Sequence, residues 1–273
     1  MQARTWLGFG VFAFAVCGFV MIGWSRVQAH TSAQTDVAPI AVAQAKPEGD
    51  AAPAAPELPA ALPPDVAFAR FIALIRGHLL TGDELASQRQ WNAEHPHFSF
   101  PTEEIYGVIR DDLRSYKTPP FDGALKALAR AVKAHNAKQY TKARQKVEGA
   151  LAAADAGLKA KAPNWPRFVV AVAIEVLKTA SDEYDDAVAK GRIVRPIGYQ
   201  TARGFILQAD RMIESVAGEL EANNAAALGD MRAGFAQLKQ AFASVTAPKQ
   251  AVMDYPAVLG IVSRIELAAG KLI

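Results

Sequence analysis

Three of the five histidines in this 273-residue chain lie in one short segment, and two carboxylates follow them. The histidines are His78, His95 and His97, and the carboxylates are Glu103 and Glu104. Imidazole nitrogen and carboxylate oxygen together suit transition metals such as iron, copper and zinc. A helical hairpin would bring the later histidines back along the helix that carries the first. The segment therefore predicts a mixed nitrogen–oxygen site for an iron, copper or zinc ion.

A purely structural role explains the same residues. Glu103 and Glu104 would lie in the first turn of a helix, where the helix dipole favours negative charge, with Thr102 as the expected N-cap. The two later histidines flank a proline, as is typical of a polar turn. Neither the Glu-x-x-His pairs of di-iron bundles nor the His-Glu-x-x-His motif of zinc proteases is present. The two interpretations differ in whether His78 meets a histidine of the turn.

The rest of the sequence offers little material for catalysis. Its one cysteine, Cys17, lies in an apolar N-terminal run, so the remaining chain has no thiol and no disulfide. We find no Ser-His-Asp combination, no glycine-rich phosphate loop and no carboxylate pair in a recognisable catalytic setting. The sequence therefore predicts a protein that is not an enzyme.

Charge is balanced along the chain. The 30 basic and 27 acidic residues are interspersed, whereas nucleic-acid binding needs a clustered cationic patch, so no nucleic-acid partner is expected. Glu175, Asp210 and Glu266 lie beside apolar stripes and are expected to pair with arginines between helices. The alternative role for the arginine-rich segment 192–203 is a pocket for a small anion.

The N-terminus predicts export. Residues 7–24 are almost unbroken apolar sequence and follow Arg4. This run fits a signal peptide cleaved near Ala29, and it also fits a retained transmembrane anchor, because it just reaches the length that spans a bilayer. Either way, the bulk of the chain is expected in the periplasm, anchored at the inner membrane or secreted after cleavage.

Three regions follow from these patterns. Residues 1–29 form the signal peptide or anchor, as an apolar helix. Residues 30–64 are rich in alanine and proline and lack apolar periodicity, so they are expected to form a disordered tether. Residues 65–273 form the folded domain.

The folded domain is expected to be all-α. Its apolar residues recur at helical spacing, for example Leu228, Met231, Phe235 and Leu238, and no stretch sustains a period of two. Prolines and glycines separate the periodic segments. We therefore predict an antiparallel bundle of helix hairpins with about eight helices.

Two segments resemble tetratricopeptide helix hairpins. In residues 137–151 the resemblance is carried by Tyr140, Ala143, Val147 and Ala150. In residues 77–101 it is carried by Gly82, Trp91, Phe98 and Pro101. The resemblance implies paired helices and a partner-binding groove, without a full repeat array.

The chain as a whole is similar to imelysin-type periplasmic proteins tied to iron uptake. The similarity consists of an exported, alanine-rich helical chain with a His/Glu segment near its start. The His-x-x-Glu motif of that family is not matched, because Thr81 stands three residues after His78. The resemblance implies an extracytoplasmic helical protein connected with iron.

Two functions are consistent with these observations. The first is a non-enzymatic, membrane-tethered interaction protein that works in a complex with a protein partner. The second is binding of a transition metal for uptake, storage or sensing through the segment from His78 to Glu104.

Overall fold

The structure, a computed structural model, describes residues 61–272, and for residues 91–95 it describes the backbone alone. The apolar run at 7–24, the cleavage position near Ala29 and nearly all of the predicted tether lie outside the described residues. Across residues 61–272, none of the helices has the length and apolar character that crossing a membrane requires.

The all-α prediction is confirmed, and eight of the nine α-helices in the described chain have ten or more residues. The helices are α1 (Pro64–Ser87), α2 (Trp91–Phe100), α3 (Tyr106–Ile109), α4 (Asp122–Lys133), α5 (Ala137–Lys159), α6 (Trp165–Ala187), α7 (Pro196–Ser215), α8 (Ala217–Ala241) and α9 (Tyr255–Ala269). A π-helical turn, Pro101–Ile105, precedes α3, and a 3-10 turn, Leu113–Tyr116, follows it. Two short strands, β1 (Val188–Ala189) and β2 (Arg192–Ile193), form a hairpin between α6 and α7.

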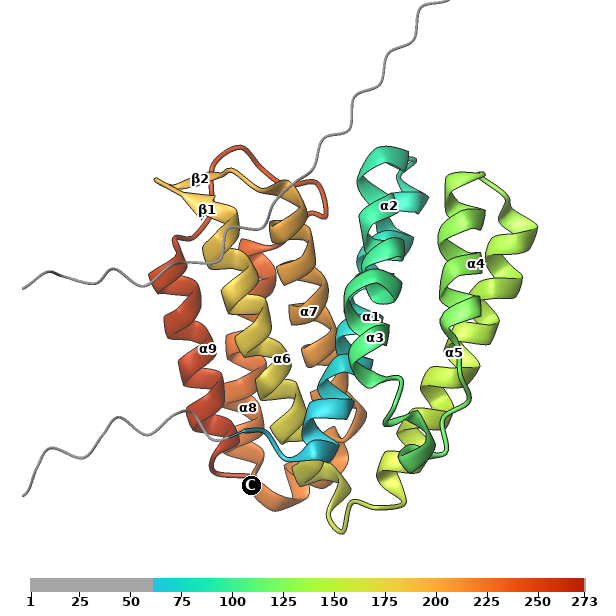
Figure 1. The fold of residues 1–273 in the computed structure, drawn as a ribbon. Coiled ribbons are helices and arrows are strands. Elements are labelled where there is room, and N and C mark those ends of the chain that lie inside the picture. The colour runs from blue at the N-terminus through green and yellow to red at the C-terminus, as the bar shows by residue number, and fades with distance from the viewer. Residues whose placement is uncertain (1–60, 273) are drawn as a thin grey trace, which may run out of the picture. The chain divides into compact units, whose positions relative to one another are not determined.

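Helices α6 to α9 stand side by side as one bundle (Figure 1). Within it, α6 packs against α7 and α9, and α8 packs against α9. Helix α1 packs against both α6 and α7 and also against α2, while α4 and α5 form a hairpin that meets α2 (Figure 1). Helix α1 therefore joins the bundle to the N-terminal hairpins.

Side-chain caps explain where several helices begin. Asn136, Asn164 and Asp254 precede α5, α6 and α9, and each accepts a hydrogen bond from the backbone N–H three residues later. Asn224 does the same inside α8, where its backbone leaves the helical conformation. Helix α8 is therefore two helical segments joined at a kink, and the second carries the predicted apolar stripe.

The predicted apolar stripes form the core. Leu228, Met231, Phe235 and Leu238 are each at most 1% exposed. Burying a large apolar side chain contributes about 2 kcal/mol relative to leaving it in water. Helical periodicity alone therefore identified which face of this helix is buried.

The prediction of a polar turn around His95 and His97 is wrong, because residues 91–100 form α2 with Pro96 inside it. A proline inside a helix removes a hydrogen bond and costs about 3 kcal/mol. Burial of Phe98, which is 0% exposed, offsets part of that cost. The predicted N-cap is also wrong, since the chain continues into the π-helical turn and the Thr102 hydroxyl is buried without a hydrogen-bond partner.

Two glycines let α1 and α7 touch backbone to backbone. A Cβ on Gly204 would overlap the carbonyl oxygen of Gly77 and the hydroxyl of Thr81. That hydroxyl donates to the carbonyl of Gln200 at 3.1 Å. The close approach places His78, the neighbour of Gly77, against α7.

Candidate functional site

The structure brings two of the predicted site histidines into contact. Nδ1 of His78 on α1 lies 3.3 Å from Nδ1 of His97 on α2. Both side chains are buried, with exposed fractions of 5% and 0%. The question left open by the sequence is thereby answered for this pair, whereas the side chain of His95 lies outside what the structure describes.

A chain of hydrogen bonds assigns the protons on both rings. The amide nitrogen of Gln200 donates to the carbonyl of Val245 at 3.2 Å, so its amide oxygen faces Nε2 of His97, also at 3.2 Å. Nε2 of His97 must then carry the proton and donate it. Its Nδ1 is left as an acceptor for Nδ1–H of His78. This assignment leaves the lone pair of His78 on Nε2.

Both rings are neutral at physiological pH. Burial and, as a smaller cause, the neighbouring His97 together lower the pKa of His78 to about 3. Burial lowers the pKa of His97 to about 4, although its hydrogen bond to Gln200 opposes the shift. Neutral imidazole is the form that binds metal ions.

A cavity of about 330 Å³ lies beside the histidine pair. His78, Phe100, Glu104, Glu183, Arg195, Pro196, Ile197, Gly198 and Thr201 line it. The structure gives Nε2 of His78 no hydrogen-bond partner among the described residues. The cavity therefore combines an unpartnered imidazole nitrogen with two carboxylates and one guanidinium.

Glu183 is the member of this cavity that the sequence did not single out. Burial raises its pKa, Arg195 lowers it, and the charges of Asp186 and Glu104 raise it again. The side chain comes from α6, far from the histidines in sequence, and it sits in the acidic run SDEYDD, which is typical of a solvated helix face. Only the α6–α7 packing reveals that it lines the cavity.

The predicted metal ligands are partly separated. Both Glu103 and Glu104 are exposed, but Glu104 lines the cavity with His78, whereas Glu103 is not part of the lining. His97 has both ring nitrogens engaged, by His78 and Gln200. Among the residues that the structure describes, no three His, Cys, Asp or Glu side chains are arranged to hold a metal ion. The metal site predicted from the sequence stays a prediction.

The carboxylates beside the apolar stripes were expected to pair with arginines, and this prediction is wrong because their partners are lysines. Glu175 and Glu266 both pair with Lys178, at 3.0 and 2.9 Å, and Asp210 pairs with Lys239 at 2.9 Å. These pairs link α6 to α9 and α7 to α8. Lysine suffices at these half-exposed positions, because no bidentate geometry is required.

Two arginines of segment 192–203, Arg195 and Arg203, are engaged by neighbouring groups. The Arg203 guanidinium binds both carboxylate oxygens of Glu84, at 2.5 and 3.1 Å, and donates to the carbonyl of Phe242 at 2.8 Å. Arg195 pairs with Asp186 at 3.0 Å and borders the cavity beside the histidine pair. Arg203 on α7 therefore links this helix both to α1 and to the end of α8.

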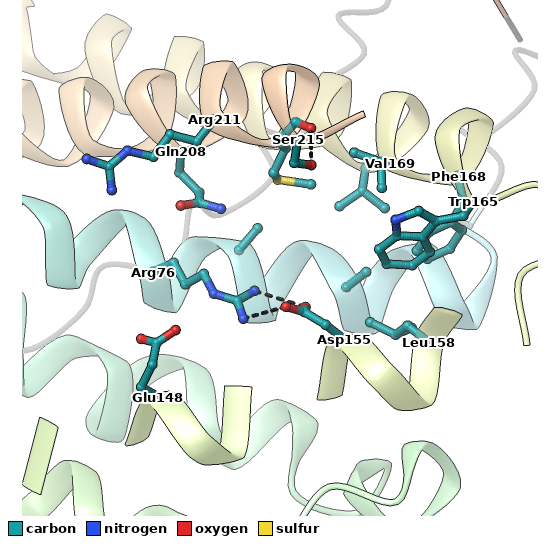
Figure 2. Close-up of a pocket in the computed structure, with 14 residues that line it drawn as sticks. Arg76, Glu148, Asp155, Leu158, Trp165, Phe168, Val169, Gln208, Arg211 and Ser215 are labelled. Atoms are coloured by element: carbon teal, nitrogen blue, oxygen red, sulfur yellow. Dashed lines mark hydrogen bonds and ion pairs between the residues drawn. The ribbon is translucent and has the colours of Figure 1, made fainter. Parts of the chain in front are cut away.

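A second cavity, of about 300 Å³, lies between α1, α5, α6 and α7 (Figure 2). The Arg76 guanidinium donates to both carboxylate oxygens of Asp155, at 3.0 and 2.7 Å. Trp165 and Phe168 stack at one end of the cavity, with ring centroids 5.6 Å apart (Figure 2). Because Asp155 already neutralises Arg76, this pair ties α1 to α5, and we assign it a structural role.

Comparison with known proteins gives a family match in the C-terminal part of the chain. Residues 159–273 match a family model described as the iron permease-associated 4-helix bundle domain. The match includes all of α6 to α9, the helices that stand together as a bundle. No curated protein and no solved structure matches the chain.

The match supports the helical architecture that the two sequence resemblances implied, but neither of those families in particular. The tetratricopeptide-like segments do form helix hairpins, α1 with α2 and α4 with α5. Gly82 of α1 lies against the ring of Phe98 on α2, where a Cβ would come within 2.7 Å of it. These are general features of packed helix pairs.

Proposed function

We propose that this chain is a non-enzymatic, extracytoplasmic accessory protein of an iron-transport system. The observation that carries the proposal is the match of residues 159–273 to the iron permease-associated bundle. The chain then works by docking on a membrane permease, and the metal, if it binds, is cargo.

The N-terminal sequence supports the compartment. The apolar run at 7–24 would direct export, and the proline-rich segment 30–64 would hold the helical domain at a distance from the membrane. A domain tethered in this way reaches a permease in the same membrane at a high effective concentration.

Helix α9 offers a surface for such a partner. Leu259 and Leu267 stand eight residues apart, so they lie on one face of the helix, and they are 40% and 72% exposed. Helix α9 packs against α6 and α8 on its other side. Exposed leucines on the outer helix of a bundle are suited to contact with an apolar partner surface.

Co-purification tests the proposal. The full chain, extracted from its own membranes in mild detergent, is expected to bring an iron permease subunit with it. The double change Leu259→Lys and Leu267→Lys should abolish this association. Val108→Lys serves as the matched control, because Val108 is also exposed, at 57%, but lies on α3. A wild-type chain that elutes without any permease subunit would contradict the proposal.

Metal binding is the second candidate function. It is favoured by one observation, that His78 and Glu104, both predicted from the sequence as ligands, line the same cavity. This function is compatible with the first, because an accessory protein of a permease can also carry the ion.

A further inference from the structure

We infer that the cavity between α1, α5, α6 and α7 binds a small organic anion with an aromatic body, of the aryl carboxylate class. Arg211 and Gln208 of α7 hold the carboxylate, and Trp165 and Phe168 of α6 hold the aromatic body. The inference goes beyond the proposed function and does not depend on it.

The cavity is polar at one end and aromatic at the other. Figure 2 shows Gln208 and Arg211 at one end, and Trp165 and Phe168 at the opposite end. Helix α7 lines the cavity with residues 208, 211, 212 and 215, a spacing that places them on one face of the helix. This face extends about 10 Å along the helix axis. A ligand that spans the cavity therefore needs one polar and one apolar end.

Arg211 is the charged lining residue that the described chain leaves unpaired. The cavity also has two carboxylates in its lining, Asp155 and Glu148. Arg76 binds the first at 3.0 and 2.7 Å, and Arg144 binds the second at 2.7 Å. Arg211 forms no hydrogen bond or ion pair with any residue that the structure describes. The charge left for a ligand to neutralise is therefore positive.

The acidic neighbours of Arg211 on α7 have other partners. Asp210 pairs with Lys239 at 2.9 Å, and Glu214 pairs with Arg232 at 2.7 Å. Both of these partners lie on α8. Arg211 therefore remains available to an anion in the cavity.

Gln208 is the second group that indicates a ligand. Its side chain is 7% exposed, and its amide forms no hydrogen bond with the rest of the described chain. Buried polar groups are nearly always hydrogen-bonded, so this amide requires a partner. Figure 2 shows the amide pointing from α7 toward α1, on the side where Arg76 also borders the cavity. Its N–H can donate to an oxygen of an anion whose charge Arg211 balances.

The aromatic end provides a surface for a ring. The rings of Trp165 and Phe168 stack at a centroid distance of 5.6 Å, with 24° between their planes. Both side chains are only partly buried, and Leu158 and Met212 line the same cavity. Aromatic rings that the protein leaves partly uncovered gain from contact with a further ring. An aromatic ligand body therefore fits this end better than a polar one.

The size of the cavity limits the ligand. Its volume is about 300 Å³, which is at the lower end of the range for small-molecule sites. At about 30 Å³ for each water-sized group, it holds roughly ten non-hydrogen atoms. This size suits a single ring that carries a short carboxylate arm and is too small for a nucleotide or a whole lipid.

Isothermal titration calorimetry of the full chain tests the site, with cinnamate as the probe and cinnamamide as its neutral analogue of the same shape. Wild-type protein should bind cinnamate about tenfold or more tightly than cinnamamide, because only the anion pairs with Arg211. Arg211→Gln should remove this preference by weakening cinnamate binding about tenfold. Arg130→Gln is the matched control, because Arg130 is an exposed arginine of α4 outside the cavity lining, and cinnamate affinity should stay within about twofold.

Two further variants separate the ends of the site. Gln208→Leu should weaken cinnamate binding several-fold, because it removes the amide donor while keeping the side-chain volume. Phe168→Ala should weaken the binding of cinnamate and cinnamamide alike, because both place a ring there. Circular dichroism melts verify that each variant is folded.

Three results would overturn the inference. The first is that wild-type protein does not bind cinnamate, and the second is that it binds cinnamate and cinnamamide equally well. The third is cinnamate binding that Arg211→Gln and Gln208→Leu both leave unchanged in folded protein, because the anion would then be bound elsewhere.

Discussion

At the scale of single residues, the distinctive feature of the described structure is a pair of neutral histidines buried between α1, α2 and α7. Their rings touch each other, two phenyl rings and one amide, and the described residues form no salt bridge with them. The low pKa values of the pair mean that its neutral state persists well below physiological pH. The pair is therefore a fixed part of the fold and not a sensor of mild acidity.

The free energy of unfolding should fall as pH is lowered from about 6.5 towards 4. In that range the unfolded chain protonates these histidines at their ordinary pKa of 6.5, whereas the folded chain holds them neutral with pKa values of about 3 and about 4. Stability is thus present above pH 6.5 and is lost below it. At pH 5 the loss is about 2 kcal/mol for each ring.

Urea unfolding at pH 7 and pH 5 measures this loss, and a His78→Phe, His97→Leu double variant supplies the comparison. Both proteins share the other titrating groups near the site, Glu104 and Glu183 of the cavity and Asp83 of α1. The difference between the two proteins in how far the free energy of unfolding falls from pH 7 to pH 5 therefore isolates the contribution of the two histidine rings. An equal fall in the free energy of unfolding for both proteins would show that the two rings are protonated at pH 5 in the folded chain as they are in the unfolded chain.

The sequence predicted the candidate site only in part. The types and spacing of the histidines indicated where to look, and His78 and Glu104 do share a cavity. Glu183 could not be predicted, because its acidic run is indistinguishable from a solvated face until α6 is packed on α7. The role of His97 depends on Gln200, a residue 103 positions away.

At the scale of elements, periodicity and capping predicted the long helices, and proline misled the prediction of α2. Pro96 indicates a break by local chemistry, but the apolar contacts of Phe98 with α1 hold the helix through it. Tertiary burial outweighs local propensity here. The π-helical turn after α2 has no sequence signal beyond the second proline, Pro101.

Two glycines on α5 should respond to alanine in opposite directions. A Cβ at Gly157 would overlap the carbonyl oxygen of Tyr116, which is backbone and cannot yield cheaply. A Cβ at Gly149 meets nothing within 4 Å. Gly157→Ala should therefore destabilise the protein by about 2 kcal/mol or more, and Gly149→Ala should stabilise it by up to about 1 kcal/mol.

Thermal melts of the two alanine variants, followed by circular dichroism, check this pair. Both changes add the same methyl group to the same helix, so helix propensity cancels from the comparison. A Gly157→Ala melt at or above that of Gly149→Ala would mean that the 3-10 turn does not press on α5.

At the scale of the whole molecule, the matched bundle and the N-terminal helices share one core. Phe205 of α7 is 2% exposed, and it lies against Gly77 of α1. Residues 159–273 expressed alone would expose this surface to water. We expect that fragment to be helical but to melt at least about 10 °C below the full chain, or to self-associate.

Residues 57–273, which form one compact unit, are the control fragment and should keep the melting temperature of the full chain. Light scattering and melting curves compare the two fragments. A monomeric 159–273 fragment with the same melting temperature would show that the bundle is independent of α1.

The contact between Gly77 and Gly204 also limits how this protein can change over generations. Any glycine codon becomes an alanine codon through one base substitution, but at Gly204 even this smallest added side chain overlaps the backbone of α1. No single change at Gly77 relieves that overlap, because the obstructing atom is a carbonyl oxygen that every amino acid carries. The two helices can therefore diverge freely on their outer faces, while at this crossing a new sequence requires a new helix spacing.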